Sequence, residues 1–492
     1  MNKEIISVIK KIYGNITDSS KDRFTSLLKI LIKLDVYPIK MERSFVHDTI
    51  KNNDRQLRHI ITDDFDIINH KTVVNSINVK HENPYIYDYL KALHSDGFLD
   101  VLLKKIHIPD NYINDIITSL KLNNINDFNN TIDKVMYIIP SFLYYLFKLV
   151  NESNNTKMID IVNKMNKKIK HIFKKIPISN KFYDNPFMSL ENYWWIENNI
   201  VEYREVSYDD IILEIYGKNN IDDNYIKEII RVVKMLKLLT KTNTKLFRCN
   251  IFLTDMKKYI DTTEVTLTNN QINTGSTVRG KNINIWRTEE LQKVLFHELI
   301  HYIKYDIVEN NDILRDKLLK KIKMCKWCSI IANESYVDCI AIIMNSIYNA
   351  CKYVDKNGSS IEYMFTILFK IDIYYTLLQA STILYLNGYE KIEEIYEKEF
   401  EQYSNVMSYY IIKSSLLFNI SDTLKFFSKS TEIFKFDGNI SKIDSYYELI
   451  NESLDNIYYR KTINDMIQYI KNDKDIKNKK ISMRMTCIDM LK

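Results

Sequence analysis

The stretch KVLFHELIHYIKYD, residues 293–306, holds the side chains best suited to chemistry. Only nine histidines occur in the 492 residues, and His297 and His301 lie four residues apart with Glu298 beside the first. On a helix this spacing is one turn, so both imidazoles project from one face and can reach one metal ion. Zn²⁺ binds imidazole nitrogens, and an adjacent carboxylate can take a proton from a water that the zinc activates. The pattern predicts a zinc site with Glu298 as general base, and its alternative is a pair of buried histidines with other hydrogen-bond partners.

A second apolar segment supplies acidic side chains for the same site. Residues 329–348, SIIANESYVDCIAIIMNSIY, carry Glu334 and Asp338 four residues apart. Enough chain separates Glu334 from His301 for a reversal of direction, so this glutamate can be a third zinc ligand. Asp338 lies one turn further on and can accept the free N–H of a zinc-bound histidine. Carboxylates among such apolar neighbours need partners, which favours the zinc site over two core histidines.

A buried helix must position the two histidines. Thr288 can cap this helix, and Glu289 and Glu290 suit the positive end of its dipole in the first turn. Apolar residues then follow on nearly all sides, so we expect the helix to be buried.

The region from about 245 to 286 is the clearest β candidate. KLFRCNIFLTD and EVTLTN alternate apolar and polar residues, and NINIW ends the run. Between them, NTGSTVRG contains Gly275 and Gly280, the only two glycines close together in the chain, and therefore predicts a turn.

The distribution of proline divides the chain into parts. All six prolines lie within the first 186 residues, where apolar helical segments alternate with turns rich in Asn and Asp. We predict a helical N-terminal domain at 1–185, a catalytic domain with a small β-sheet at 186–350, and a helical C-terminal domain at 351–492 that completes the cleft. The expected fold class is mainly α with a small β-sheet, that is, α+β.

Composition restricts partners and location. A net charge of +6 with interleaved basic and acidic residues predicts no nucleic-acid partner. No run of 18 apolar residues occurs, so we expect no membrane span, and the N-terminus does not read as a secretion signal. The six cysteines are dispersed, with Cys325 and Cys328 as a lone CxxC. This distribution suits free thiols in a reducing intracellular compartment.

The two motifs together resemble those of the gluzincin clan of metallopeptidases. They read His297-Glu298-x-x-His301 and Asn333-Glu334-x-x-x-Asp338. The resemblance implies a zincin-like core with an active-site helix and a glutamate helix, and one Zn²⁺ per chain bound by both histidines and Glu334. It implies that Glu298 acts as general base and then as acid. The metzincin alternative needs a third histidine soon after the motif, and no histidine follows His301.

The resemblance also bears on the substrate and the source. It implies that a strand before the HExxH helix borders the cleft and pairs with an extended peptide, and INIW (283–286) is placed for this role. Residues 270–345 carry the match, and the run around HELIH is similar to hypothetical metallopeptidase-like proteins of large cytoplasmic DNA viruses. A viral source would place the protein in the host cytoplasm or the virion.

Gluzincin sites add a His, Tyr or Arg from further along the chain to stabilise the oxyanion. Because no histidine follows His301, a tyrosine or arginine must serve here. The candidates are Tyr375, Tyr409, Tyr410 and Arg484.

We therefore predict a zinc-dependent peptidase with a polypeptide substrate. The Gly-x-Met-x-Asn signature of aminopeptidases in this clan is absent, which favours an endopeptidase. Two alternatives remain. One is a non-catalytic, zinc-stabilised virion or scaffold protein, and the other is a toxin-like peptidase that acts on a host protein.

Overall fold

The computed structural model describes residue 39, residues 41–72, a few positions between 187 and 200 and, with short gaps, residues 202–488. By its contacts the chain divides into two compact units, one of residues 1–73 with 202–492 and one of residues 74–201. Most of the predicted N-terminal domain lies outside the described residues. The predicted boundary after residue 350 falls inside a helix, Asn333–Asn357.

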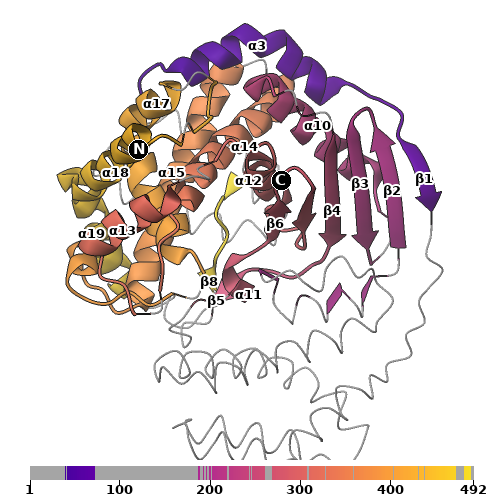
Figure 1. The fold of residues 1–492 in the computed structure, drawn as a ribbon. Coiled ribbons are helices and arrows are strands. Elements are labelled where there is room, and N and C mark those ends of the chain that lie inside the picture. Colours follow the sequence, from indigo (N-terminus) through magenta and orange to yellow (C-terminus); the bar gives the residue numbers. More distant parts are fainter. Residues whose placement is uncertain are drawn as a thin grey trace, which may run out of the picture. The chain divides into compact units, whose positions relative to one another are not determined.

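A six-stranded mixed sheet forms one side of the first unit (Figure 1). Its strands are β1 (Ile68–Thr72), β2 (Glu202–Tyr208), β3 (Ile211–Gly217), β4 (Phe247–Leu253), β6 (Gly275–Val278) and β7 (Asn282–Ile285). The spatial order is β1-β2-β3-β4-β7-β6. Strands β3, β4 and β7 run parallel, whereas β1, β2 and β6 pair antiparallel with their neighbours. Strand β6 therefore forms one edge of this sheet.

The β prediction is confirmed in part. Strands β4 and β7 lie where the alternation predicted them, while most of EVTLTN lies outside the described residues. The predicted turn is wrong in extent, because Gly275–Val278 is a strand and the chain reverses only at Gly280, whose φ is +67°. Strands β2 and β3, and β1 within the region predicted as helical, were not expected. INIW is not at the edge of the sheet either, since β7 pairs with β4 on one side and β6 on the other.

Helices make up most of the described chain, so the structure is mainly α with a small β-sheet, as predicted. They are α3 (Phe45–Thr62), α10 (Asp223–Thr240), α11 (Asn269–Ile272), α12 (Leu291–Tyr302), α13 (Asn311–Lys321), α14 (Asn333–Asn357), α15 (Ile361–Leu386), the 3₁₀-helix η1 (Ile392–Tyr396), the π-helix η2 (Met407–Ile412), α16 (Lys413–Phe418), α17 (Ile420–Ser428), α18 (Ile440–Asp455) and α19 (Ile457–Asn472). Helix α12 contacts β6, β7 and α10, helix α14 packs on α12, and α15 packs on α14 (Figure 1). These contacts place the HELIH helix between the sheet and the helical layers.

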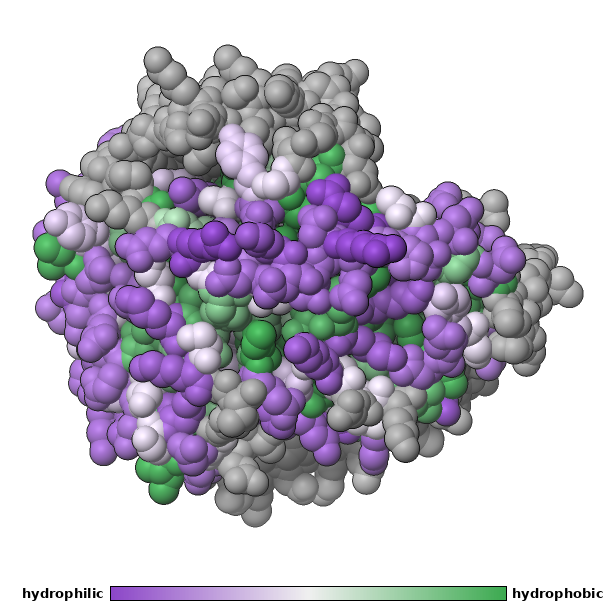
Figure 2. Space-filling model, turned by 90° about the horizontal axis from the view of Figure 1, so that it is seen from above, coloured by the Kyte–Doolittle hydropathy of each residue, from purple (hydrophilic) through white to green (hydrophobic). Residues whose placement is uncertain are grey.

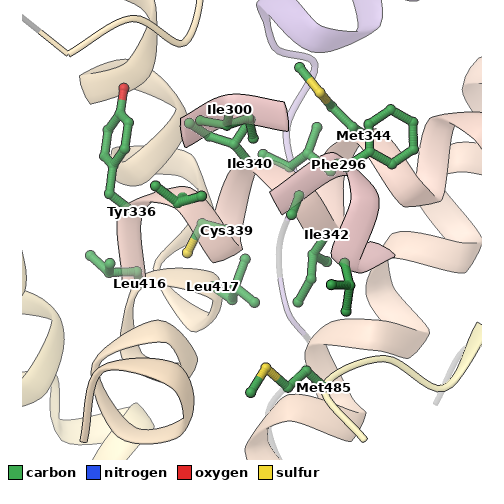
Figure 3. Packing of buried hydrophobic residues seen from close by; sticks show 14 of the residues in the cluster. Phe296, Ile300, Tyr336, Cys339, Ile340, Ile342, Met344, Leu416, Leu417 and Met485 are labelled. Carbon is green, nitrogen blue, oxygen red and sulfur yellow. The ribbon is translucent and has the colours of Figure 1, made fainter. Parts of the chain in front are cut away.

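Helix α12 is buried on all sides, as its composition predicted. Every residue from Leu291 to Ile300 is buried, and Phe296 and Ile300 pack among side chains of α14 and α16 (Figure 3). The predicted N-cap is wrong, because the helix begins at Leu291 and the backbone N–H of Thr288 donates to Thr254 O at 3.1 Å. Glu289 and Glu290 are buried as well, so their carboxylates bind neighbouring side chains and backbone rather than solvent at a helix start.

Those two carboxylates hold the C-terminal segment in the core. Glu290 accepts a hydrogen bond from the amide of Thr486 at 3.0 Å and forms a fully buried ion pair with Lys258 at 2.8 Å. Glu289 pairs with Arg484 and accepts the amide of Lys258 at 2.8 Å. The antiparallel pair β5 (Tyr259–Ile260) and β8 (Ile481–Ser482) continues this contact. Segments more than 190 residues apart are thus tied together beneath α12.

The longest apolar helix belongs to the core. Helix α15 is long and apolar enough to cross a membrane, but 94% of its most apolar 18-residue stretch is buried against the rest of the protein. A surface view shows hydrophilic residues spread over the described face, with hydrophobic residues scattered among them (Figure 2). We therefore interpret α15 as the central helix of a globular core.

The expectation of free thiols holds for four of the six cysteines. Cys249, Cys339, Cys351 and Cys487 are buried and take part in no disulfide among the described residues. Cys325 and Cys328, in contrast, form a disulfide with Cα atoms 5.2 Å apart. The two residues face each other across a turn in which the amide of Cys328 donates to Cys325 O at 2.9 Å. This turn makes the CxxC a bonded pair, which the sequence prediction missed.

Candidate metal centre

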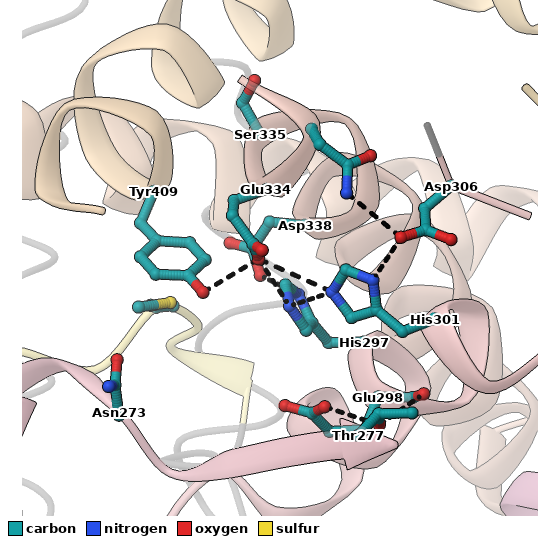
Figure 4. A network of polar contacts seen from close by, with 12 residues as sticks. Asn273, Thr277, His297, Glu298, His301, Asp306, Glu334, Ser335, Asp338 and Tyr409 are labelled. Atoms are coloured by element: carbon teal, nitrogen blue, oxygen red, sulfur yellow. Dashed lines mark hydrogen bonds and ion pairs between the residues drawn. The ribbon is translucent and has the colours of Figure 1, made fainter. Parts of the chain in front are cut away.

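The structure brings the three predicted ligand residues together. His297 and His301 project from one face of α12, and Glu334 reaches them from the first turn of α14 (Figure 4). The two Nε2 atoms are 3.2 Å apart, and Glu334 Oε2 lies 3.2 Å from that of His297 and 3.5 Å from that of His301. Helix periodicity places both imidazoles on one face of α12, and the packing of α14 on α12 brings Glu334 to them.

A carboxylate behind each imidazole fixes which nitrogen carries the proton. His297 Nδ1 is 2.9 Å from Asp338 Oδ1, and His301 Nδ1 is 2.7 Å from Asp306 Oδ2. A carboxylate accepts hydrogen bonds, so each Nδ1 carries the hydrogen and each Nε2 of a neutral ring presents a lone pair. Two lone pairs and a carboxylate oxygen therefore point at one another. Such a group is stable only if a proton or another cation lies between them.

The donor set fits a zinc ion. Zn–N bonds of about 2.0–2.1 Å at tetrahedral angles separate neighbouring donor atoms by about 3.3–3.4 Å. The three distances between donor atoms, 3.2, 3.2 and 3.5 Å, lie close to this value. Two imidazole nitrogens and one carboxylate oxygen are also the ligand types of catalytic rather than structural zinc sites.

Electrostatics keep Glu334 ionised. Burial by itself raises the pKa of this carboxyl, but the charge and hydrogen bonds of His301 and His297 outweigh it and hold the pKa far below the ordinary value. For His301, burial lowers the pKa, and Glu334 and Asp306 more than offset this and leave the pKa well above 6.5. The carboxylates thus favour positive charge at the position where the three donor atoms meet.

Asp306 is a residue of this site that the sequence prediction missed. It lies after the end of α12, and besides His301 it binds Arg279 and accepts a hydrogen bond from Asn333 Nδ2 at 3.1 Å. One carboxylate therefore ties the second histidine to the end of β6 and to the residue before Glu334. The only signal in the sequence is an aspartate five residues after the second histidine of HExxH.

Asp338, on the other side, is held by two buried lysines. Lys413 Nζ lies 2.7 Å from Asp338 Oδ2, and Lys293 pairs with Oδ1. Both lysine side chains are no more than 2% exposed. Burial raises the pKa of Asp338, and these two charges and His297 reverse the effect, so the pKa lies well below its usual range. Asp338 is thus a fixed carboxylate in the position that the sequence predicted.

Glu298 lies against the edge strand. Thr277 Oγ1 donates to Glu298 Oε2 at 2.7 Å and also lies 3.0 Å from the backbone oxygen of Glu298 (Figure 4). Gly275, two residues earlier on β6, leaves room for the carboxylate, because a Cβ there would lie 2.7 Å from Oε1. Burial is the largest influence on this group and raises its pKa above 4.5. A buried carboxylate with a raised pKa is suited to accept a proton.

Of the four candidate oxyanion donors, Tyr409 is at the site. Its hydroxyl donates to Glu334 Oε2 at 2.9 Å, and its ring centroid lies 5.9 Å from that of His297. Tyr410 donates to Met483 O, and Arg484 pairs with Glu289. Tyr375 contacts Gln379. Tyr409 belongs to the π-helix η2, an irregular turn of a kind that is frequent at functional sites.

Comparison with curated proteins shows similarity to a viral protein. The chain is 28% identical over 185 residues to "Uncharacterized protein R210" of Acanthamoeba polyphaga mimivirus. The match covers 36% of this chain and 45% of the mimivirus protein, so less than half of that relative's length is spanned. No protein-family model and no solved structure matches the chain.

Proposed function

We propose that this protein is a zinc-dependent peptidase whose metal is held by His297, His301 and Glu334. The observation that carries the proposal is the convergence of three lone-pair atoms, with each imidazole oriented by its own carboxylate. If the two histidines were buried residues without a metal, the Nε2 atom of each neutral ring would need a hydrogen-bond donor. Here both Nε2 atoms face acceptors instead. A cation of zinc's size and ligand preference satisfies all three atoms at once.

The residues around the three ligands have distinct roles in hydrolysis. When bound, zinc supplies Lewis acidity that lowers the pKa of water towards neutrality and polarises a carbonyl. Glu298 takes the proton of the attacking water and returns it to the leaving amine. Of the four candidate donors, the Tyr409 hydroxyl, 2.9 Å from Glu334, is the one that lies at the ligands, and we assign it to stabilise the oxyanion.

An extended peptide suits the edge of the sheet. In the described part of the chain β6 pairs with β7 and stands at the edge of the sheet, the position at which an extended peptide can add a strand. The same strand carries Thr277, which holds Glu298, so a peptide on β6 would run past the general base. We infer a polypeptide substrate and favour an endopeptidase. Similarity to a mimivirus protein supports a viral setting.

Elemental analysis combined with a cleavage assay tests the proposal. The native protein is expected to hold one zinc per chain and to cleave members of a peptide library. His301→Ala should lose the zinc, whereas Glu298→Gln should keep it, and both should be inactive. The exposed His59 and Glu452 provide matched controls, because His59→Ala and Glu452→Gln should change neither zinc content nor cleavage.

The alternatives give different results. Stoichiometric zinc in a native protein that cleaves no peptide would favour the non-catalytic, zinc-stabilised role. If the native protein held no zinc, the two histidines of the HELIH motif would be buried core residues rather than metal ligands. Cleavage of one host protein, with none in the library, would point to the toxin-like peptidase.

A further inference from the structure

The disulfide lies where two segments of the metal centre meet. Cys325 and Cys328 immediately precede the chain that leads into α14 and Glu334. They contact Phe400 and Gln402, which precede η2 and Tyr409 in the chain. The backbone N–H of Cys325 donates to Phe400 O at 3.1 Å, and an isolated parallel β-bridge pairs Met324 with Phe400.

Gln402 connects the disulfide to the π-helix. Its backbone N–H donates to Cys328 Sγ at 3.4 Å, and its backbone carbonyl oxygen lies 3.3 Å from the same sulfur. Its side chain bridges onward, donating to Ser329 O at 2.5 Å and accepting the amide of Met407 at 2.7 Å. Met407 is the first residue of η2, two residues before Tyr409. One buried glutamine thus links the sulfur to the helix that carries the tyrosine.

We propose that the Cys325–Cys328 disulfide is a thiol-exchange site whose closure holds Gln402 and the start of η2 in place, and with them Tyr409 at the metal centre. A monothiol attacks one sulfur, the S–S bond breaks, and the other cysteine leaves as a thiolate that takes a proton. A second monothiol then releases the first as its disulfide, so two thiols are oxidised for each dithiol formed. The consequence for catalysis rests on the proposed function, whereas the exchange and the movement do not.

The local packing decides which sulfur moves. After reduction the two sulfurs are no longer bonded and must move apart to an ordinary non-bonded contact. Cys325 is only 5% exposed and its side chain is enclosed by the core, whereas Cys328 is half-buried. The displacement therefore falls on Cys328, the sulfur that contacts Gln402. The partial exposure of Cys328 also gives a monothiol access to it.

The other four cysteines provide an internal reference. All are buried, and burial raises the pKa of Cys249 to about 12, so its thiol reacts slowly. Alkylation of the folded protein should therefore report on Cys325 and Cys328 alone.

The experiment is a titration of the full-length protein in mixtures of reduced and oxidised glutathione, followed by alkylation and mass spectrometry. We expect two cysteines to change from protected to alkylated as the mixture becomes more reducing, and four to react only after unfolding. Amide hydrogen exchange at Met407 should accelerate by about tenfold on reduction, on the order of one lost hydrogen bond. Gln402→Leu should give the fast exchange in both redox states while the disulfide still forms.

Each result bears on a different part of the proposal. A pair that stays reduced in every mixture, or a Met407 amide that exchanges at the same rate with the pair open and closed, would overturn it. Peptide cleavage should fall on reduction and recover on reoxidation in the native protein, but should not respond in Gln402→Leu. If the protein cleaved no peptide but hydrogen exchange at Met407 still followed the redox state, the result would support the thiol-exchange site and count against the proposed peptidase function.

Discussion

Replacing Gly275 by alanine should displace the carboxylate of Glu298 without touching a metal ligand. The added Cβ would lie 2.7 Å from Oε1, 2.9 Å from Cγ and 3.0 Å from Cδ of Glu298. Ordinary contacts begin at 3.4 Å, so the side chain must shift by about 0.4–0.7 Å. The movement also strains the hydrogen bond of 2.7 Å from Thr277.

The expected loss follows from the size of that shift. A misplacement of about 1 Å in a catalytic group can cost about 100-fold in rate, so Gly275→Ala should lower kcat by about 10- to 100-fold. Zinc content should stay at one per chain, because all three ligands lie on α12 and α14.

Steady-state cleavage of a fluorogenic peptide, with elemental analysis of the same samples, measures both quantities. Ser445→Thr is the control, since it adds one methyl group on the exposed face of α18, away from β6, and should leave kcat unchanged. In a Glu298→Gln background, Gly275→Ala should cause no further loss, because the group it displaces is already inactive. Full activity in Gly275→Ala would refute the assignment of Glu298 as a base positioned by β6.

Three further predictions concern other parts of the site. Asp306→Asn should weaken zinc binding by about 10- to 100-fold, measured by competition with a chelator, because the second histidine loses its orienting carboxylate. Tyr409→Phe should lower kcat by about 100-fold or more with zinc retained, whereas the neighbouring Tyr410→Phe should affect only thermal stability. Burial raises the pKa of Glu290, but nearby lysines outweigh this effect and hold the pKa below 4.5. The contribution of Glu290 to stability is therefore present above pH 4.5 and is lost as the pH falls through the lowered pKa. Glu290→Gln should therefore destabilise the fold by about 3–5 kcal/mol at neutral pH, and the difference in melting temperature from the native protein should shrink in acid.

The prediction of local structure succeeded where residues close in sequence decide it. The burial of α12 follows from apolar residues on all its faces, and the shared face of His297 and His301 follows from 3.6 residues per turn. Strands β4 and β7 were recognised because their alternation is strong. Strands β2 and β3 were not predicted, because the sequence EYREVSYDDIILEIYG alternates polar and apolar residues only weakly. Their β-structure depends on the pairing of the two strands in the sheet.

Tertiary contacts explain the errors in the prediction of the elements. Glu289 and Glu290 look like residues of a first helical turn, but the C-terminal segment approaches them and binds their carboxylates. Likewise, INIW looks like an edge strand because it directly precedes the helix, yet β6 folds back outside it through the turn at Gly280. Neither the returning segment nor the order of strands leaves a local trace in the sequence.

The sequence by itself predicted which three side chains meet and which carboxylate lies beside the first histidine, because metal chemistry restricts which side chains can serve and helix geometry restricts their spacing. Only the tertiary structure decided that Asp306 orients His301, that Tyr409 rather than three other candidates reaches Glu334, and that β6 holds Glu298. These side chains come from segments far apart in the chain. Their meeting depends on how α12, α14, η2 and the sheet edge pack, which is a property of the whole core rather than of any one segment.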